Sequence, residues 1–414
     1  MIMALMGAFS YYGFGVFFNP IAQHFGWSAT ALALALSLAR LEGGIMAPFM
    51  GFLIDRFGPR KLMFVGLLAS GIGYLLLSQT TSLTYFYIVF ILLVQGGASA
   101  GMGNAPMTAV ANWFQRRRAT AMGVMNLGIS IGGLMARPLA DLITAFGWRW
   151  ALGLAGITIW VAGIPLALVV RHRPEQYGYL PDGRAPENPQ RVDAATSEGA
   201  VDSHTDDAQQ AEYKEIDFSP RQAMRTMAFW SIALMFSARH LVTGSVALFL
   251  IPLLQERGMS LSSAASVISL MALLGMPGRV GFAWLGDHFD KRWVIAFCFV
   301  FQSVGLILFT TIGGNVGIAL FLILYAPTYS GVLPLIPAIQ GEYFGRMWFA
   351  TIRGFMAPIG TISLVGGPLL VGSIHDLSGS YEPAFFLLAV ANILALVFIL
   401  ITRKPKDPAF RAAL

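Results

Sequence analysis

The stretch that decides the fold is Gly51-Phe52-Leu53-Ile54-Asp55-Arg56-Phe57-Gly58-Pro59-Arg60-Lys61. It is a short polar turn with one acid, three bases and two glycines, and long apolar segments lie on both sides of it. Because hydrocarbon offers no partners for so many polar groups, the turn marks a membrane surface. A degenerate copy of this turn follows at 283–292, where Asp287 corresponds to Asp55. One turn, used twice at corresponding points, predicts a chain of two similar halves.

The composition is that of a membrane protein. Of 414 residues, 56% are hydrophobic and only 12% are charged, whereas a soluble domain has about a quarter charged residues. Twelve apolar segments approach the length of about 20 residues that crosses a bilayer core as a helix. They are 2–23, 29–53, 62–78, 84–112, 119–144, 150–171, 227–255, 261–285, 293–312, 315–342, 349–375 and 381–402. We therefore predict an all-α membrane protein with twelve transmembrane helices in two pseudo-symmetric six-helix bundles.

The net charge of +6 comes from bases gathered on one side of the membrane, and it does not indicate nucleic-acid binding. Of the 27 Lys and Arg residues, 20 lie in the loops and tail of one side, and only Arg149 and Arg257 lie in the opposite loops. This bias predicts cytoplasmic N- and C-termini. We expect a monomeric multi-pass protein of the cell (inner) membrane, with the lipid bilayer as its surroundings.

A polar tract divides the chain. Few apolar residues occur between Pro181 and Gln210, so this part cannot bury a core. The predicted organisation is an N-terminal six-helix bundle at 1–171, a largely disordered cytoplasmic linker at 172–226, a C-terminal six-helix bundle at 227–402 and a cytoplasmic tail at 403–414. Duplicated six-helix bundles are typical of transporters whose site lies at the bilayer midplane between the halves.

The glycine, aspartate and arginine spacing of the 51–61 turn resembles the major facilitator superfamily. Further stretches are similar to its monocarboxylate transporter and oxalate/formate exchanger group. They are Gly15-Val16-Phe17-Phe18, Trp113-Phe114-Gln115-Arg116-Arg117-Arg118, Gly278-Arg279 and Gly367-Pro368. The resemblance implies that Arg279 is the substrate arginine. Proton-coupled animal relatives carry an aspartate four residues before that arginine, where this chain has Gly275, and a lysine in the first span, which is absent here.

Five arginines lie inside predicted spans, while Glu42 is well inside one and Asp141 lies near the end of another. The arginines are Arg40, Arg137, Arg239, Arg279 and Arg353. Each buried charge is costly unless it is paired or hydrated. The excess of cations predicts an electropositive cavity that attracts an anion, and arginine can hold a carboxylate by two parallel hydrogen bonds.

The predicted roles of these charged residues differ. We expect Arg279 to bind substrate and Arg239, which is too deep to reach the surface, to contact substrate or a gate. His240 beside it can carry a proton or simply pack against neighbouring helices.

Arg40 and Glu42 are two residues apart and cannot share a helix face, so each needs its own partner in coupling, gating or an ion pair between helices. Arg137 and Asp141 are four apart and can form an ion pair. Asp141, like Glu42 and His240, is also a candidate for proton coupling in place of the relay that is absent here. Arg353, near the start of its span, is expected to reach the surface in a structural or gating role.

Polar residues of the expected cavity helices complete the candidate substrate site. They are Tyr11, Asn104, Tyr325 and Tyr329. The last two are four apart and can face one cavity. A tyrosine offers a hydroxyl to a carboxylate and a ring to a short alkyl chain. Packing or interhelical hydrogen bonding is the alternative for each of them.

Asp55 is expected to form a cytoplasmic latch. Near the C-terminal end of its own helix it is poorly placed for the helix dipole and needs a cation. Arg56, Arg60 or the 116–118 run can supply one. Because the second copy at Asp287 has lost the arginine and glycine that follow, we expect the first copy to carry more of the latch.

The sequence therefore predicts a secondary active transporter of a small organic anion, such as a monocarboxylate, by proton symport or anion exchange. Efflux of amphipathic compounds is the alternative, and a transport-like sensor is a further one. No phosphate-binding loop, His/Cys metal cluster or hydrolase signature is visible in the sequence. We expect no cofactor, metal or enzymatic activity.

Overall fold

The computed structural model describes residues 1–11, 14–183 and 216–407. Within these ranges all regular secondary structure is helical, which confirms the predicted all-α fold. The helices before residue 170 form the N half. They are α1 (Ile2–Leu5), η1 (Met6–Tyr11), α2 (Phe14–Phe25), α3 (Ala29–Phe57), α4 (Pro59–Ser78), α5 (Leu83–Ile88), η2 (Val89–Gln95), α6 (Gly96–Ala98), η3 (Ser99–Asn104), α7 (Ala105–Trp113), α8 (Arg118–Gly133), α9 (Ala136–Phe146), α10 (Trp148–Thr158), η4 (Ile159–Gly163) and α11 (Ile164–Val169).

The helices after residue 215 form the C half, in which each predicted span is one long helix. They are α14 (Pro220–Met224), α15 (Met227–Glu256), α16 (Leu261–His288), α17 (Lys291–Ile312), α18 (Gly314–Phe344), α19 (Phe349–Ser378) and α20 (Glu382–Ile401). In the described part of the chain, 11 helices are long and apolar enough to cross a membrane. The first predicted span falls on the shorter apolar run Ile2–Phe18, which crosses residues 12–13 outside the described ranges.

Local sequence explains where several helices begin and end. Ser28, Thr226 and Ser260 precede α3, α15 and α16, and each side chain accepts a hydrogen bond from a backbone N–H three residues on. Such caps satisfy donors that a helix leaves free at its start. Gly58 and Gly345 have φ of +87° and +79°, which a glycine adopts readily and lets the chain reverse between long helices. The starts of α8 and α19 have no such cap, which matters for the gate described below.

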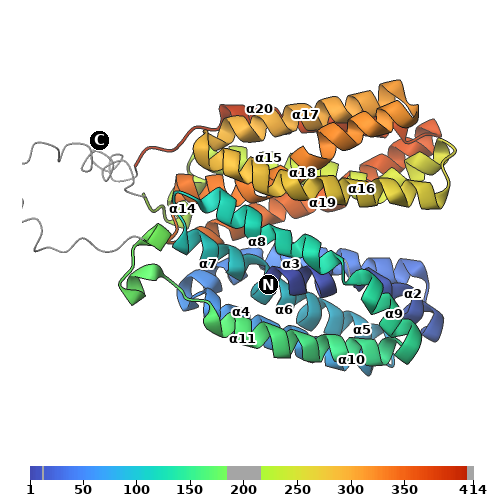
Figure 1. Ribbon diagram of the computed structural model, residues 1–414, viewed down its shortest axis with the longest axis horizontal. Helices are drawn as coiled ribbons and strands as arrows, with labels where there is room; N and C mark the ends of the chain where they lie inside the picture. Colours follow the sequence, from blue (N-terminus) through green and yellow to red (C-terminus); the bar gives the residue numbers. More distant parts are fainter. Residues whose placement is uncertain (12–13, 184–215, 408–414) are drawn as a thin grey trace, which may run out of the picture.

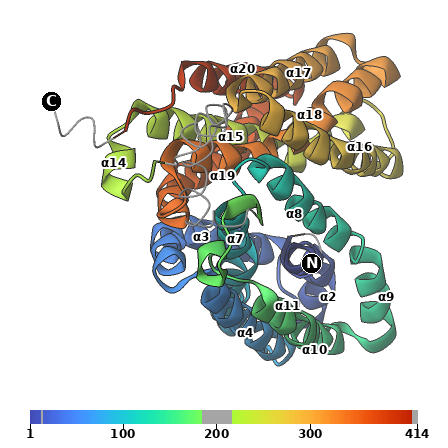
Figure 2. The same cartoon turned by 60° about the vertical axis from the view of Figure 1, so that its left-hand side comes forward.

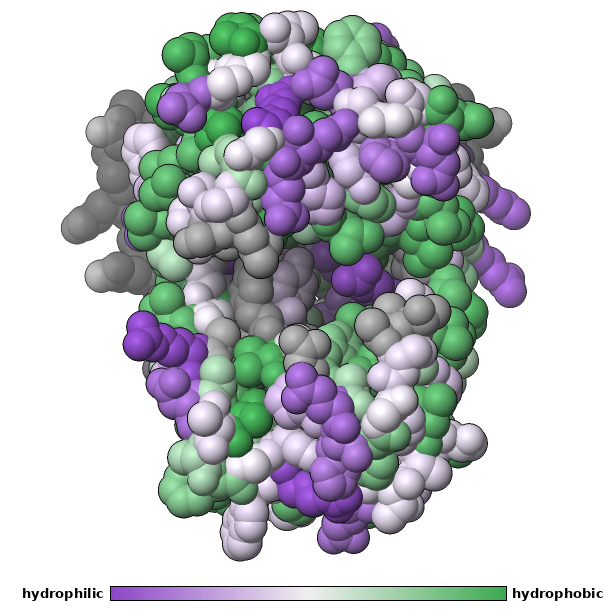
Figure 3. Space-filling view, turned by 90° about the vertical axis from the view of Figure 1, so that its right-hand side faces the viewer, coloured by the Kyte–Doolittle hydropathy of each residue, from purple (hydrophilic) through white to green (hydrophobic). Residues whose placement is uncertain are grey.

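The two halves lie side by side, close together at one end and further apart at the other (Figures 1 and 2). The loops 58–61, 114–118 and 289–292, each with at least two arginines or lysines, and the loop 345–348, with Arg346, lie at the close end, which we call the basic end. On the opposite face a hollow lies between the halves (Figure 3). The structure is thus closed at the basic end and open at the other.

The predicted linker is partly folded. Residues 172–183 include the short helices η5 (Pro174–Tyr177) and η6 (Pro181–Gly183), and residues 216–226 include α14. The predicted linker is therefore folded at its two ends, 172–183 and 216–226. Residues 184–215 lie outside the described ranges, as do residues 408–414 of the tail.

Candidate substrate site

Four cationic or protonatable side chains of the C half are brought near one another from three helices. Arg239 and His240 come from α15, Arg279 from α16 and Arg353 from α19, and we call them the cation cluster. Arg239 is influenced electrostatically by Arg279, and His240 by both Arg239 and Arg353. In the described part of the chain, no Asp or Glu forms an ion pair with any of the four. The cluster is therefore a concentration of positive charge without a counter-charge.

Buried hydrogen-bonding atoms of the cluster lack partners. The atoms without a partner among the described residues are Arg239 Nε, Arg279 Nε, His240 Nδ1 and the hydroxyl of the adjoining Tyr325. Buried polar atoms in folded proteins nearly always have a partner, so exceptions require an explanation. Several convergent unsatisfied groups in one place are what a site for a small polar ligand requires.

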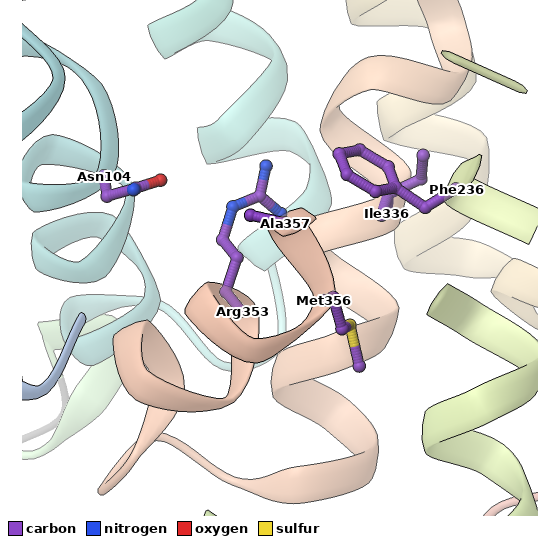
Figure 4. Close-up of a pocket in the computed structure, with 6 residues that line it drawn as sticks. All are labelled: Asn104, Phe236, Ile336, Arg353, Met356 and Ala357. Carbon is purple, nitrogen blue, oxygen red and sulfur yellow. The ribbon is translucent and has the colours of Figure 1, made fainter. Parts of the chain in front are cut away.

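Arg353 lines a cavity of ≈ 130 Å³ between the two halves. Its guanidinium lies between Asn104 of the N half and Phe236 of the C half (Figure 4). The guanidinium carbon is 5.9 Å from the Phe236 ring centroid, and Arg353 makes no hydrogen bond or ion pair within the described ranges. The expectation that it reaches the surface was wrong, because α19 starts at the closed gate and continues along the cavity.

Arg279 joins the two halves. Its Nη1 donates to the Asn126 carbonyl of α8 at 3.1 Å and to the Ser130 hydroxyl. This approach needs close contact between α8 and α16, and Gly123 provides it: a Cβ there would lie only 2.8 Å from the Arg279 carbonyl oxygen. The residue predicted to bind substrate is therefore also a residue whose bonds must change when the halves move.

The aromatic candidates surround Arg239. Its Nη2 donates to the Tyr329 carbonyl at 3.2 Å, and its guanidinium carbon lies 5.4 Å from that residue's ring centroid. Tyr325 stacks on Tyr329 with centroids 5.6 Å apart, so the two do share a face. Tyr325 is fully buried, whereas Tyr11 at the end of η1 is exposed, and both act electrostatically on Arg239. Asn104 lines the Arg353 cavity.

The remaining charged candidates lie apart from the cluster. Arg40 is exposed, and the half-buried Glu42 has a carboxylate oxygen 3.8 Å from the Cβ position of Gly96. Arg137 and Asp141 are both exposed. The ion pair expected between these two is not among those formed by the described residues, so that expectation was wrong.

Asp55 closes the gate at the basic end by capping a helix of the other half. One of its carboxylate oxygens accepts from the Ala350 N–H at 3.1 Å, and the other accepts from the Thr351 N–H and hydroxyl at 2.7 Å each. The start of α19 has no cap of its own, so Asp55 satisfies its free donors and meets the positive end of its dipole. Gly51 makes room, because a Cβ there would overlap the Ala350 carbonyl.

Asp287 makes the same contact in the second repeat. Its carboxylate accepts from the Ala119 N–H at 2.9 Å and the Thr120 N–H at 2.7 Å, at the uncapped start of α8. Each half therefore caps a helix of the other. The first copy makes one more hydrogen bond than the second, from the Thr351 hydroxyl. That the first copy carries more of the latch stays a prediction.

The bases of the turn are not the partners that we expected for Asp55. Arg56 is exposed, and its guanidinium lies 5.8 and 5.6 Å from the ring centroids of Phe52 and Phe57. Arg60 is exposed as well. A helix N-terminus supplies the positive charge instead, and the sequence does not show which helix that is.

A transporter architecture has these features: a cavity between two halves, helix pairs that pack across the halves at glycines, and an aspartate cap in each repeat. The profile of the Major Facilitator Superfamily matches residues 1–363. The chain belongs to this superfamily. It is therefore a multi-pass membrane protein of a transporter family, as the sequence motifs implied.

Similar proteins carry several organic substrates. The oxalate:formate antiporter of Oxalobacter formigenes is 25% identical over 93% of this chain and 85% of its own. Monocarboxylate transporter 12-B of Danio rerio is 23% identical over 91% of this chain and 80% of its own. The hexuronate transporter of Bacillus subtilis is 25% identical over 89% of this chain and 86% of its own. The solved E. coli fucose:proton symporter superposes with a TM-score of 0.69 at 14% identity, covering 98% and 97% of the two chains. These matches support the fold and leave the substrate open.

Proposed function

We propose that this protein is a secondary active transporter of a small organic anion, which it moves by alternating access. The observation that carries the proposal is the cation cluster, with its unpartnered buried donors and without a carboxylate partner among the described residues. A carboxylate can accept hydrogen bonds from more than one arginine and reduces the repulsion among them. An amphipathic cation would instead require acids at this place.

The proposed cycle uses the two aspartate caps. With the caps formed, the basic end is closed and the cluster is reached from the opposite face. Anion binding changes the bonds of Arg279, which joins the halves, and release of both caps opens the basic end. We place the basic end, with the N- and C-termini, in the cytoplasm of a cell (inner) membrane, because basic loops are retained on that side.

A monocarboxylate or a similarly small anion fits this proposal. The cavity of ≈ 130 Å³ is smaller than the volume of about 300 Å³ or more typical of sites for drug-sized ligands. The relatives include transporters named for oxalate, formate and monocarboxylates. We propose that one monomer performs the transport, by proton symport or anion exchange. Glu42 and Asp141 lie outside the cluster, so His240 is the proposed coupling residue if protons are carried.

Uptake of radiolabelled formate, acetate, lactate, pyruvate and oxalate into proteoliposomes tests the proposal. Arg279→Gln should reduce uptake at least tenfold, because a hydrogen bond to a charged group contributes about 1.5–3 kcal/mol. Arg257→Gln is the matched control, since Arg257 forms an ion pair with Glu382 at the opposite end, away from the cluster. Unchanged uptake by Arg279→Gln, or transport of cations alone by the wild type, would contradict the proposal.

The same vesicles separate the two coupling modes. Uptake driven by an imposed pH gradient indicates proton symport, whereas uptake driven only by internal anion indicates exchange. His240→Gln should abolish the first and spare the second.

A further inference from the structure

A second cavity lies on the outer surface of the C half at the basic end. It is a groove of ≈ 490 Å³ between the start of α15 and the end of α20. The residues that matter for its chemistry are Arg225, Met227, Trp230, Leu234, Phe398 and Ile401. It is separate from the cation cluster, which faces the space between the halves.

Most of the groove is apolar and faces the surroundings of the bundle. Met227 is 72% exposed and Trp230 49%, and Ile401 is exposed as well. The Trp230 indole nitrogen donates to the Met224 carbonyl at 2.9 Å, which fixes the ring as one wall. Tryptophan is typical of the membrane interface, where its ring lies at the level of the lipid headgroups. In a membrane these walls contact an acyl chain.

The mouth of the groove is positively charged. Arg225 lines it and is exposed, and its guanidinium makes no hydrogen bond or ion pair within the described ranges. Arg403 and Lys404, both exposed, follow Ile401 after the buried Thr402 at the other side of the groove. The 30-residue helix α15 also begins here, and its N-terminus favours negative charge. None of the lining residues is acidic.

We propose that this groove binds an anionic phospholipid. Its phosphate would meet Arg225 and the start of α15, and one acyl chain would lie against Trp230, Leu234 and Phe398. Basic pockets between transmembrane helices at a membrane surface recognise anionic headgroups in this way. A zwitterionic lipid offers the same chain but no net negative charge, so the groove discriminates between lipids by charge.

Native mass spectrometry of the detergent-purified full chain, titrated with phosphatidylglycerol or phosphatidylcholine, tests the proposal. We expect the wild type to bind phosphatidylglycerol more tightly than phosphatidylcholine. In Arg225→Gln the ratio of the two affinities should fall about fivefold, as expected for the loss of one basic residue at a membrane surface. The matched control is Lys61→Gln, which removes an exposed cation of the N half that does not line this groove. Trp230→Leu should weaken both lipids.

Three outcomes would overturn the proposal. The first is equal affinity for the two lipids. The second is an Arg225→Gln variant that keeps the full preference, or a Lys61→Gln variant that loses it equally. The third is displacement of phosphatidylglycerol by inorganic phosphate or glycerophosphoglycerol at similar concentration, which would indicate a free phosphate site. Thermal unfolding of each variant without added lipid checks that the fold is retained.

Discussion

At the scale of single residues, the arginines of the cation cluster differ in how many hydrogen bonds to the protein hold their side chains. Arg279 is held by Asn126 and Ser130 of α8, and Arg239 by the Tyr329 carbonyl. Arg353 forms no hydrogen bond within the described ranges and lies against the ring of Phe236. A cation with few protein bonds has the most donors left for a ligand. Arg353 is therefore the arginine that we expect to contact the anion most directly in the state described.

We predict that Arg353→Gln lowers kcat/KM for anion uptake by about tenfold or more, because a charge-assisted hydrogen bond is lost. Arg353→Lys should retain part of the activity, since it keeps the charge but loses the planar fork. Uptake in proteoliposomes measures both. Since Arg353 makes no bond to the protein among the described residues, thermal stability without anion should change little. A large loss of stability with normal uptake would assign Arg353 a structural role instead.

At the scale of helices, the gate consists of two helix starts whose caps belong to other helices. Asp55 at the end of α3 caps α19, and Asp287 at the end of α16 caps α8. A carboxylate at a helix N-terminus contributes about 0.5–2 kcal/mol as a cap. Because each cap crosses between the halves, that free energy stabilises the closed gate as well as the helix.

We predict that Asp55→Asn favours the state open at the basic end. The reporter is Ala111→Cys, since Ala111 is fully buried beside Met122 and Phe349 at the gate, and the native Cys298 is buried. Labelling by a membrane-impermeant maleimide should become about two- to fivefold faster, because Asn keeps an accepting oxygen but loses a charge that contributes about 0.3–1 kcal/mol at a helix N-terminus.

The control for this variant is Asp290→Asn. Asp290 caps α17 within its own half, by accepting from the Arg292 N–H at 2.9 Å. Asp290→Asn should lower thermal stability without changing the labelling rate of the Ala111→Cys reporter. Since neither aspartate is in the cation cluster, the ranking of anions should be the same in both variants. A changed ranking in Asp55→Asn would contradict this separation of gate and site.

At the scale of the whole molecule, the two folded ends of the linker hold corresponding loops of the two halves. Asp182 accepts from the Arg116 N–H at 3.0 Å, and Asp217 accepts from the Arg346 N–H at 2.8 Å. Arg346 then reaches across to the N half, where it donates to the Asn112 carbonyl at 3.0 Å and forms an ion pair with Glu175. The two described ends of the linker are thus part of the closed basic end.

We predict that Glu175→Gln also speeds labelling of the Ala111→Cys reporter, by at most about fivefold, because ion pairs near the surface contribute about 0–1 kcal/mol. Glu342→Gln is the matched control: Glu342 forms an ion pair with Lys291, but both belong to the C half. High salt should speed labelling of the parent and reduce the difference. Equal effects of the two variants would show that the Glu175 pair has no special role in the gate.

The sequence by itself determined the all-α class, the long spans and the repeated aspartate turn. These follow from local properties, because hydrophobic length and basic loops specify spans without reference to distant residues. It also identified most of the cation cluster, since charges inside apolar segments stand out. It did not show which of these charges meet. Arg40 is exposed, and Arg137 and Asp141 form no ion pair with each other in the part of the chain that the structure describes.

Only the tertiary structure decided which partners these residues have. The bonds from Ala350 and Thr351 to Asp55 join residues 295 and 296 positions apart, and a helix N-terminus leaves no sequence signal as a binding partner. Arg353 likewise lies near the start of a span in the sequence, yet the packing of α19 against α3 carries it into the cavity. A cap or a cavity is formed by surfaces of separate helices, so it exists only once those helices are packed.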